Sequence, residues 1–91
     1  MMKHTVNVTR EDISLGVEVS CDGCPIARAI SRNIPGSQVF VLGDTAIING
    51  GWVSLPRECL EFVCRFDNGL PVAPFSFTLD LQKYPEGYKC Q

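Results

Sequence analysis

Cys21 and Cys24, in the sequence CDGC, are the most closely spaced cysteines of the chain. Pro25 follows directly, and proline suits the first position of a helix, so Gly23 or Cys24 should cap a helix that begins there. At a helix N-terminus, unpaired backbone N–H groups and the positive end of the dipole stabilise an anion. We therefore expect the pKa of the Cys24 thiol to be lowered, which favours a thiolate that can attack a disulfide or bind a metal.

Zinc binding is one chemistry that this pair permits, because two thiolates at this spacing can both reach one tetrahedral ion at about 2.3 Å. A zinc site then needs further ligands. The remaining candidates are His4, Cys59, Cys64 and Cys90. None of them belongs to a second C-x-x-C or to an H-x3-H arrangement, so the spacing rule for zinc sites is not met. If the protein does bind a metal, Cys21 and Cys24 are the expected ligands.

Redox exchange is a second interpretation of the pair. In thioredoxin-like proteins, however, the motif follows a long apolar strand of a βαβ unit, whereas here it follows only Val17–Ser20. The third interpretation, which we favour, is structural. Two reduced thiols would pack like small hydrophobic side chains beneath the helix start. In that case the protein needs no cofactor.

Three other side chains are candidates for binding. Arg28 and Arg32 lie one helical turn apart and could hold a phosphate or an acidic partner, although exposed charges more often face only water. Trp52 follows a tight turn. If it lies on an outer face it is the best binding anchor of the chain, and the alternative is a place in the core.

Catalytic signals are missing from the sequence. His4 is the one histidine, and no serine, cysteine or carboxylate lies close enough in sequence to form a catalytic set with it. The chain also contains neither of the glycine-rich motifs that cradle phosphates. We therefore expect a protein that is not an enzyme.

Two amphipathic helices are predicted to position these residues. The first covers 25–34, with Arg28, Ser31 and Arg32 on its polar side. Its apolar side consists of Ile26, Ala27, Ala29, Ile30 and Ile34. The second covers 56–67, with Cys59, Phe62, Val63 and Phe66 spaced as a core face. Its exposed side carries Arg57, Glu61 and Arg65, which we expect to form an i, i+4 ladder.

A shorter helix is predicted over 10–15. Thr9 would cap it, Glu11 and Asp12 would complement its dipole, and Ile13 and Leu15 would form its apolar side. The link 17–20 that follows should be extended.

Five segments alternate as strands do. The first is 4–8, with Val6 and Val8 on one face. The stretch 37–55 contains turn signals at 43–44 and 49–51, which predict a three-strand antiparallel meander over 37–42, 45–49 and 52–55. The last strand should place Phe75, Phe77, Leu79 and Leu81 on one face. The first and last strands should lie near each other or beside the meander.

The predicted fold is therefore a single small α+β domain over residues 1–91, with a mainly antiparallel sheet that includes a three-strand meander and is covered by two amphipathic helices. Residues 82–91 lack periodicity and are expected to form a loosely held C-terminal tail.

The composition supports a globular domain, with 45% apolar residues, 20% charged residues and a formal net charge of −2 in 91 residues. This weak charge argues against a DNA mimic and against a basic nucleic-acid binder. The start of the chain holds no apolar run of signal-peptide length, and no run reaches membrane-spanning length. We therefore expect a cytoplasmic protein with reduced cysteines and no membrane partner.

Two motifs resemble a known group of sequences. The pattern V-T-x-E-D-I at Val8–Ile13, followed by S-C-x-x-C-P-I-A-x-A-I at Ser20–Ile30, resembles small uncharacterised proteins encoded by bacteriophages and prophages. The resemblance implies a genomic setting and the cytoplasm of a host cell. It implies no reaction and no catalytic residues.

Two function classes follow. The first is a non-catalytic interaction module, such as a phage protein that binds and inhibits a host protein, for example a CRISPR-type defence complex. Small size, the lack of catalytic motifs and the phage-like resemblance favour it. The alternative is a thiol-dependent protein that uses Cys21 and Cys24 for zinc binding or redox chemistry.

Overall fold

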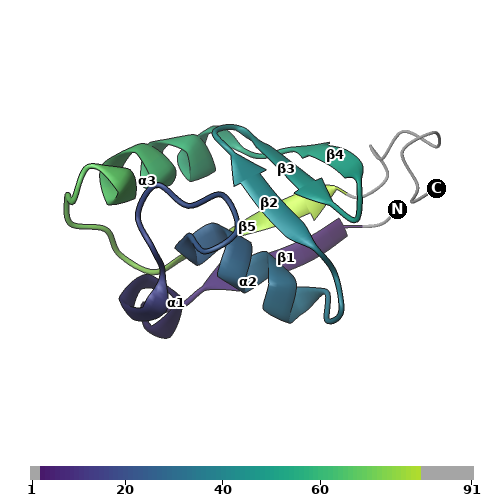
Figure 1. Cartoon of the computed structure of the whole chain (residues 1–91), viewed down its shortest axis with the longest axis horizontal. Coiled ribbons are helices and arrows are strands. Elements are labelled where there is room, and N and C mark those ends of the chain that lie inside the picture. The colour runs from purple at the N-terminus through teal and green to yellow at the C-terminus, as the bar shows by residue number, and fades with distance from the viewer. Residues whose placement is uncertain (1–2, 81–91) are drawn as a thin grey trace.

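Five strands and three helices make up the part of the chain that the computed structural model describes, residues 3–80. In chain order they are β1 (Lys3–Val8), α1 (Arg10–Leu15), α2 (Pro25–Asn33), β2 (Val39–Leu42), β3 (Thr45–Ile48), β4 (Gly51–Ser54), α3 (Arg57–Asp67) and β5 (Phe75–Asp80) (Figure 1). The fold is α+β, as predicted. Leu81 and the predicted tail at 82–91 lie outside the described residues.

The predicted meander is confirmed as a three-stranded antiparallel sheet in the order β2–β3–β4. The turn between β3 and β4 places Asn49 at φ 53° and Gly50 at φ 85°. Two successive positive φ angles give the turn a twist that matches paired strands. The inner face of this sheet consists of Val39, Val41, Ala46, Ile48 and Val53, all of which are buried.

The first and last strands form a second sheet. β1 pairs with β5 antiparallel, with Val6 opposite Phe77 and Val8 opposite Phe75. Val6, Val8 and Phe77 face the core, which confirms the predicted alternation. All strand pairs are therefore antiparallel, as predicted, but they are divided between two sheets that approach each other at β4 and β5.

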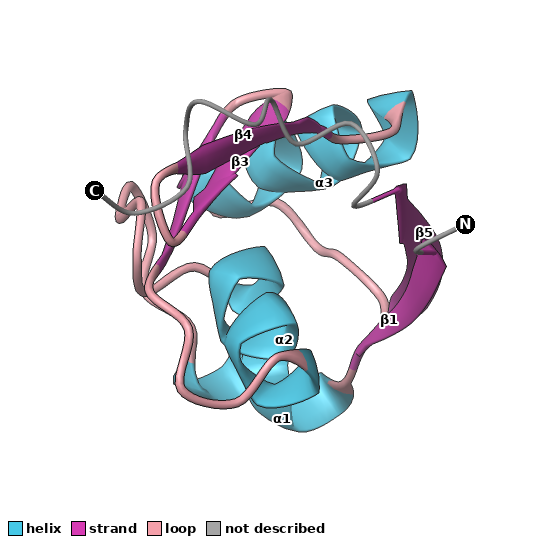
Figure 2. Cartoon of the chain, turned by 90° about the vertical axis from the view of Figure 1, so that its right-hand side faces the viewer, coloured by secondary structure: helices cyan, strands magenta, loops and turns pink. Residues whose placement is uncertain are grey.

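Helix α2 connects the two sheets, because it packs against β1 and against β2 and also contacts α1. Its apolar side is buried as predicted. Figure 2 shows α1 and α2 on one side of the molecule, α3 and the meander on the other, and the β1–β5 ribbon beside both. The core lies between these parts.

Helix α3 faces the core with Cys59, Phe62 and Phe66, in the predicted helical phase. Its aromatic rings continue onto β5. The ring centroids of Phe62 and Phe75 are 5.0 Å apart, and those of Phe75 and Phe77 are 5.7 Å apart. Pro56 precedes the helix as its N-cap and does not occupy its first turn.

Three local predictions were wrong. In α1 the buried residue is Asp12. Of the two predicted apolar residues, Ile13 packs against the core, whereas Leu15 is 56% exposed. The link 17–20 is not extended, because it turns at Glu18–Val19, where Val19 adopts a φ of 53°. A β-branched residue is strained at such an angle. The Val19 N–H is held there by a 2.9 Å hydrogen bond to Oδ1 of Asp67.

The third correction concerns the ladder on α3. Arg57, Glu61 and Arg65 are exposed as predicted, but no ion pair joins them among residues 3–80. Arg65 donates instead to the backbone carbonyl of Pro71, from Nε at 3.2 Å and from Nη2 at 3.1 Å. The Pro71 carbonyl accepts from two of the guanidinium nitrogens, and an ion pair with the exposed Glu61 carboxylate would add little stability in its place.

The phase of α3 can be tested by substitution. Phe62→Ala removes a ring that is 6% exposed and stacked on its neighbours, so it should lower the free energy of unfolding by about 3–5 kcal/mol. Arg57→Ala, on the exposed side, should change it by less than about 0.5 kcal/mol. Urea denaturation of both variants measures the difference. The reverse ranking would show that the helix buries its other side.

Candidate functional site

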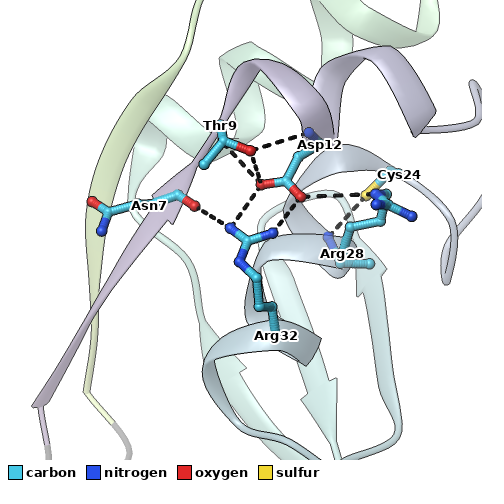
Figure 3. Close-up of polar contacts among 7 residues, drawn as sticks. Asn7, Thr9, Asp12, Cys24, Arg28 and Arg32 are labelled. Carbon is cyan, nitrogen blue, oxygen red and sulfur yellow. Dashed lines mark hydrogen bonds and ion pairs between the residues drawn. The ribbon is translucent and has the colours of Figure 1, made fainter.

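Asp12 is fully buried and forms a bidentate ion pair with Arg32 (Figure 3). Nη1 of Arg32 donates to Oδ1 at 2.6 Å, and Nη2 donates to Oδ2 at 2.9 Å. Nη2 also donates to the backbone carbonyl of Asn7 at 2.8 Å. One guanidinium thus ties α2 to α1 and to β1. The structure places Arg32, which we had considered for binding a phosphate or an acidic partner, in an internal pair.

Thr9 satisfies the rest of the Asp12 carboxylate through a capping box at the start of α1. The backbone N–H of Thr9 donates to Oδ2 at 2.9 Å, and the Thr9 hydroxyl donates to the same oxygen at 3.1 Å. Burial by itself would raise the pKa of Asp12. The donors on Arg32 and Thr9 outweigh burial, so the pKa of Asp12 is lowered. The hydrogen bonds that Arg32 donates to Asp12 raise the pKa of Arg32.

Arg28 points its Nε at the same carboxylate. The distance from Nε to Oδ1 of Asp12 is 3.8 Å, within ion-pair range but too long for a hydrogen bond. This Nε is buried and has no hydrogen-bond acceptor among the described residues. The two arginines therefore converge on Asp12 (Figure 3). Their side chains are still 36% and 47% exposed, so binding of a phosphate or an acidic partner by this pair stays a prediction.

Cys24 is the N-cap of α2, as the sequence suggested. Its Sγ accepts a 3.4 Å hydrogen bond from the backbone N–H of Ala27, and the residue is only 3% exposed. Burial raises the pKa of the thiol more than the N–H groups of Ala27 and Ile26 lower it. The prediction of a lowered pKa was therefore wrong, because loss of water around a thiolate outweighs the helix N-terminus here.

Cys21 is exposed, in contrast to its partner. Its backbone carbonyl accepts a 2.6 Å hydrogen bond from the N–H of Val41, which fastens the cysteine loop to the edge of β2. Both cysteines are free thiols. The structural interpretation is confirmed for the buried thiol of Cys24. It was wrong for the thiol of Cys21, which is exposed and contributes to the fold through its backbone carbonyl.

The possible zinc ligands do not gather around this pair within residues 3–80. No group of three His, Cys, Asp or Glu residues there could hold a metal ion. Cys59 is buried on α3, and burial raises the pKa of its thiol to about 12. Cys90, the fifth cysteine, lies outside the described residues. The described part of the chain thus adds no support for a metal centre.

Trp52 lies on the outward side of the meander and is 48% exposed, which answers the question of core or surface. Ile47 is its partner across the strands, and Phe40 is the next partner in the same row. Leu42, also outward, is 49% exposed. We call this side of the sheet the outer face. Its outward positions are Phe40, Leu42, Thr45, Ile47, Trp52 and Ser54.

Sequence reasoning missed two features of the surface and core. Asp12 was assigned only to the helix dipole, although its spacing of three from Thr9 is that of a capping box. A groove between α3 and the segment 71–75 was not foreseen. This groove forms because the segment 71–75 passes beside α3, and no periodic pattern in the sequence predicts that path.

The chain was compared with family models, with curated proteins and with solved structures, and none of the three comparisons found a match. Within residues 3–80, no helix has the length and apolar character needed to cross a bilayer.

The two arginines provide a matched pair of substitutions. Arg32→Ala leaves the buried Asp12 carboxylate without its main partner. Breaking a buried pair usually costs about 3–5 kcal/mol, and because Arg32 is 47% exposed we expect about 2–3 kcal/mol. Arg28→Ala should cost less than about 1 kcal/mol, since its contact with Asp12 is long. Urea denaturation should rank them in this order, and equal losses would contradict the assigned role of Arg32.

The same pair predicts a pH dependence. The folded pKa of Asp12 lies below the ordinary value of 3.8, so its stabilisation is complete above that value and is lost as the pH falls through the folded pKa. From about pH 4 downward, wild type should lose stability more steeply than Asp12→Asn, which has no carboxyl group to protonate. Parallel stability curves in acid would exclude a lowered pKa.

The thiols should differ in reactivity. In native protein, iodoacetamide should modify Cys21 and Cys64, which are exposed, while Cys24 and Cys59 should react only after unfolding because they are buried and their pKa values are raised. Mass mapping of labelled peptides distinguishes each site. Fast labelling of Cys24 in the folded state would revive the thiol-dependent alternative.

Proposed function

We propose that this protein is a non-catalytic interaction module that binds another protein through the outer face of the β2–β3–β4 sheet. One observation carries the proposal. Four of the six outward positions of this sheet hold large apolar side chains, namely Phe40, Leu42, Ile47 and Trp52. An antiparallel sheet with one face in water normally alternates apolar inward and polar outward residues. Here both faces are largely apolar.

The composition of the outer face suits a protein partner. Tryptophan is enriched at interface hot spots, where a large ring is buried on binding and surrounded by contacts that exclude water. Phe40, Ile47 and Trp52 form one continuous row across the three strands, so a partner could cover all three together. The core of a typical interface has the same aromatic and aliphatic character.

The identity of the partner class comes from the sequence resemblance. Small phage-encoded proteins act inside a host cell, which supports a host protein as the partner and the host cytoplasm as the location. Binding would then inhibit a host factor, such as a defence complex of the CRISPR type. The thiol-dependent alternative is less well supported, because a buried Cys24 with a raised pKa is a poor nucleophile.

The proposal is tested by a matched pair of variants. Wild type, Trp52→Ala and Leu70→Ala are used as affinity baits in a bacterial lysate, and a captured protein is then purified and titrated against each bait. Leu70 lies outside the sheet yet is 49% exposed, almost the same as Trp52, so it controls for the loss of any exposed apolar side chain. We expect Trp52→Ala to weaken binding at least tenfold and Leu70→Ala to leave it unchanged.

Other outcomes would refute this assignment. Equal binding by all three baits would show that the outer face is not the contact surface. If sedimentation instead showed a wild-type dimer that Trp52→Ala dissociates, the outer face would be an interface between two copies of this chain, and the host-protein proposal would fail.

A further inference from the structure

A groove runs between α3 and the segment that leads into β5. It has a volume of about 480 Å³ and is lined by Glu58, Glu61, Phe62, Arg65, Pro71, Val72, Ala73 and Phe75. We call it the α3 groove. This volume lies within the range of about 300–1,000 Å³ that ligand sites occupy. The groove shares no residue with the outer face, so an argument about it is independent of the function proposed above.

The floor of the α3 groove is aromatic and fixed. The Phe62 and Phe75 rings lie 5.0 Å apart with a tilt of 31°. Phe66 stacks on Phe62 from within the core at 6.2 Å. Because these rings support one another, an apolar side chain that enters the groove meets a preformed surface and does not have to order it.

The far wall is held at a fixed distance from the helix. Arg65 donates twice to the carbonyl of Pro71, which joins the C-terminal half of α3 to the start of the 71–75 segment. Pro71 and Pro74 further restrict that segment, since proline fixes its own φ. The width of the groove is therefore built into the fold, and the Arg65 donors that set it are already engaged.

The charges at the rim favour a cation. Glu58 and Glu61 are exposed on adjacent turns of α3, and neither carboxylate has an ion-pair partner among residues 3–80. A lysine or arginine that approached them would lose little hydration and gain two opposite charges. Arg65 sets one positive charge against these two negative ones, so an acidic partner or a nucleic-acid phosphate meets a net repulsion.

We infer that the α3 groove binds a segment of a partner protein that inserts one large apolar side chain and places a lysine or arginine against Glu58 and Glu61. A protein segment fits better than a small metabolite. Small ligands are oriented by a few polar groups that converge inside a pocket. In this groove the polar side chains lie at the rim and the interior is apolar.

The test uses the full chain, labelled with ¹⁵N, and three short peptides. The first peptide contains phenylalanine flanked by lysines, the second replaces the lysines with glutamates, and the third replaces the phenylalanine with alanine. The amide shifts on titration should cluster at Glu58, Phe62, Val72 and Phe75 for the first peptide only. Raising the salt from about 50 to about 500 mM should weaken that binding severalfold, because exposed charges are screened.

Variants then separate the charge from the apolar contact. The double variant Glu58→Gln/Glu61→Gln should weaken the first peptide at least fivefold. The control Glu11→Gln/Glu18→Gln removes the same charge from exposed positions outside the groove and should leave affinity unchanged. Ala73→Trp should fill the groove and abolish binding, and since Ala73 is exposed the variant should remain folded.

Four results would overturn the inference. They are equal binding of the lysine and glutamate peptides, equal loss in the two double variants, shifts that cluster away from the groove, and shifts that arise on concentrating the protein alone, which would indicate a second copy. Trp52→Ala should bind the first peptide as wild type does. Failure of the outer-face proposal and failure of this one are thus distinguishable.

Discussion

The Asp12 carboxylate has no access to water, so its charge is tolerable only if the protein itself replaces the lost hydration. Arg32 supplies two donors and Thr9 supplies two more. The arrangement also fixes geometry, because a planar guanidinium meets a carboxylate along both oxygens only in one orientation. Arg32 also donates a third hydrogen bond to the backbone carbonyl of Asn7, which fixes the guanidinium relative to β1. A helix of only six residues, α1, is in this way locked between a strand and a longer helix.

Helix α2 is held at its C-terminal end by the ion pair between Arg32 and Asp12, and at its N-terminal end by the cap at Cys24. Its apolar side contacts β1 of one sheet and β2 of the other. A thiol is a weak acceptor, yet at a cap buried to 97% it satisfies an N–H that water cannot reach. The backbone of Cys21 meanwhile fastens the preceding loop to β2. Of the two cysteines, Cys24 thus caps the start of α2, and Cys21 connects the loop before it to the edge of β2.

Most of the secondary structure could be predicted because its signals are local. The phase of α3, the alternation of Val6 and Val8, and the turn at Asn49–Gly50 each depend on residues within a few positions of one another. The pairing of Asp12 with Arg32 joins residues 20 positions apart, and nothing in either local pattern distinguishes a buried aspartate from one that faces solvent. The pKa of Cys24 was misjudged for a related reason. The helix N-terminus is visible in the sequence, whereas the strands and helix that exclude water from the thiol are not.

The exposed Trp52 and the fixed α3 groove follow from how few layers a chain of this size can form. Helices α1 and α2 lie on one side of the molecule and α3 lies near the other (Figure 2). No helix in residues 3–80 buries Trp52 or Leu42, which are 48% and 49% exposed. An exposed apolar surface is unfavourable, because the fold forgoes roughly 25 cal/mol of stabilisation for each Å² of apolar area that it does not bury. The exposed area belongs to outward side chains, where serine or threonine should keep the strand pairing and the inner face unchanged. On this face Phe40 and Ile47 are partly buried while Leu42 and Trp52 are about half exposed, an arrangement that the binding function proposed above would maintain.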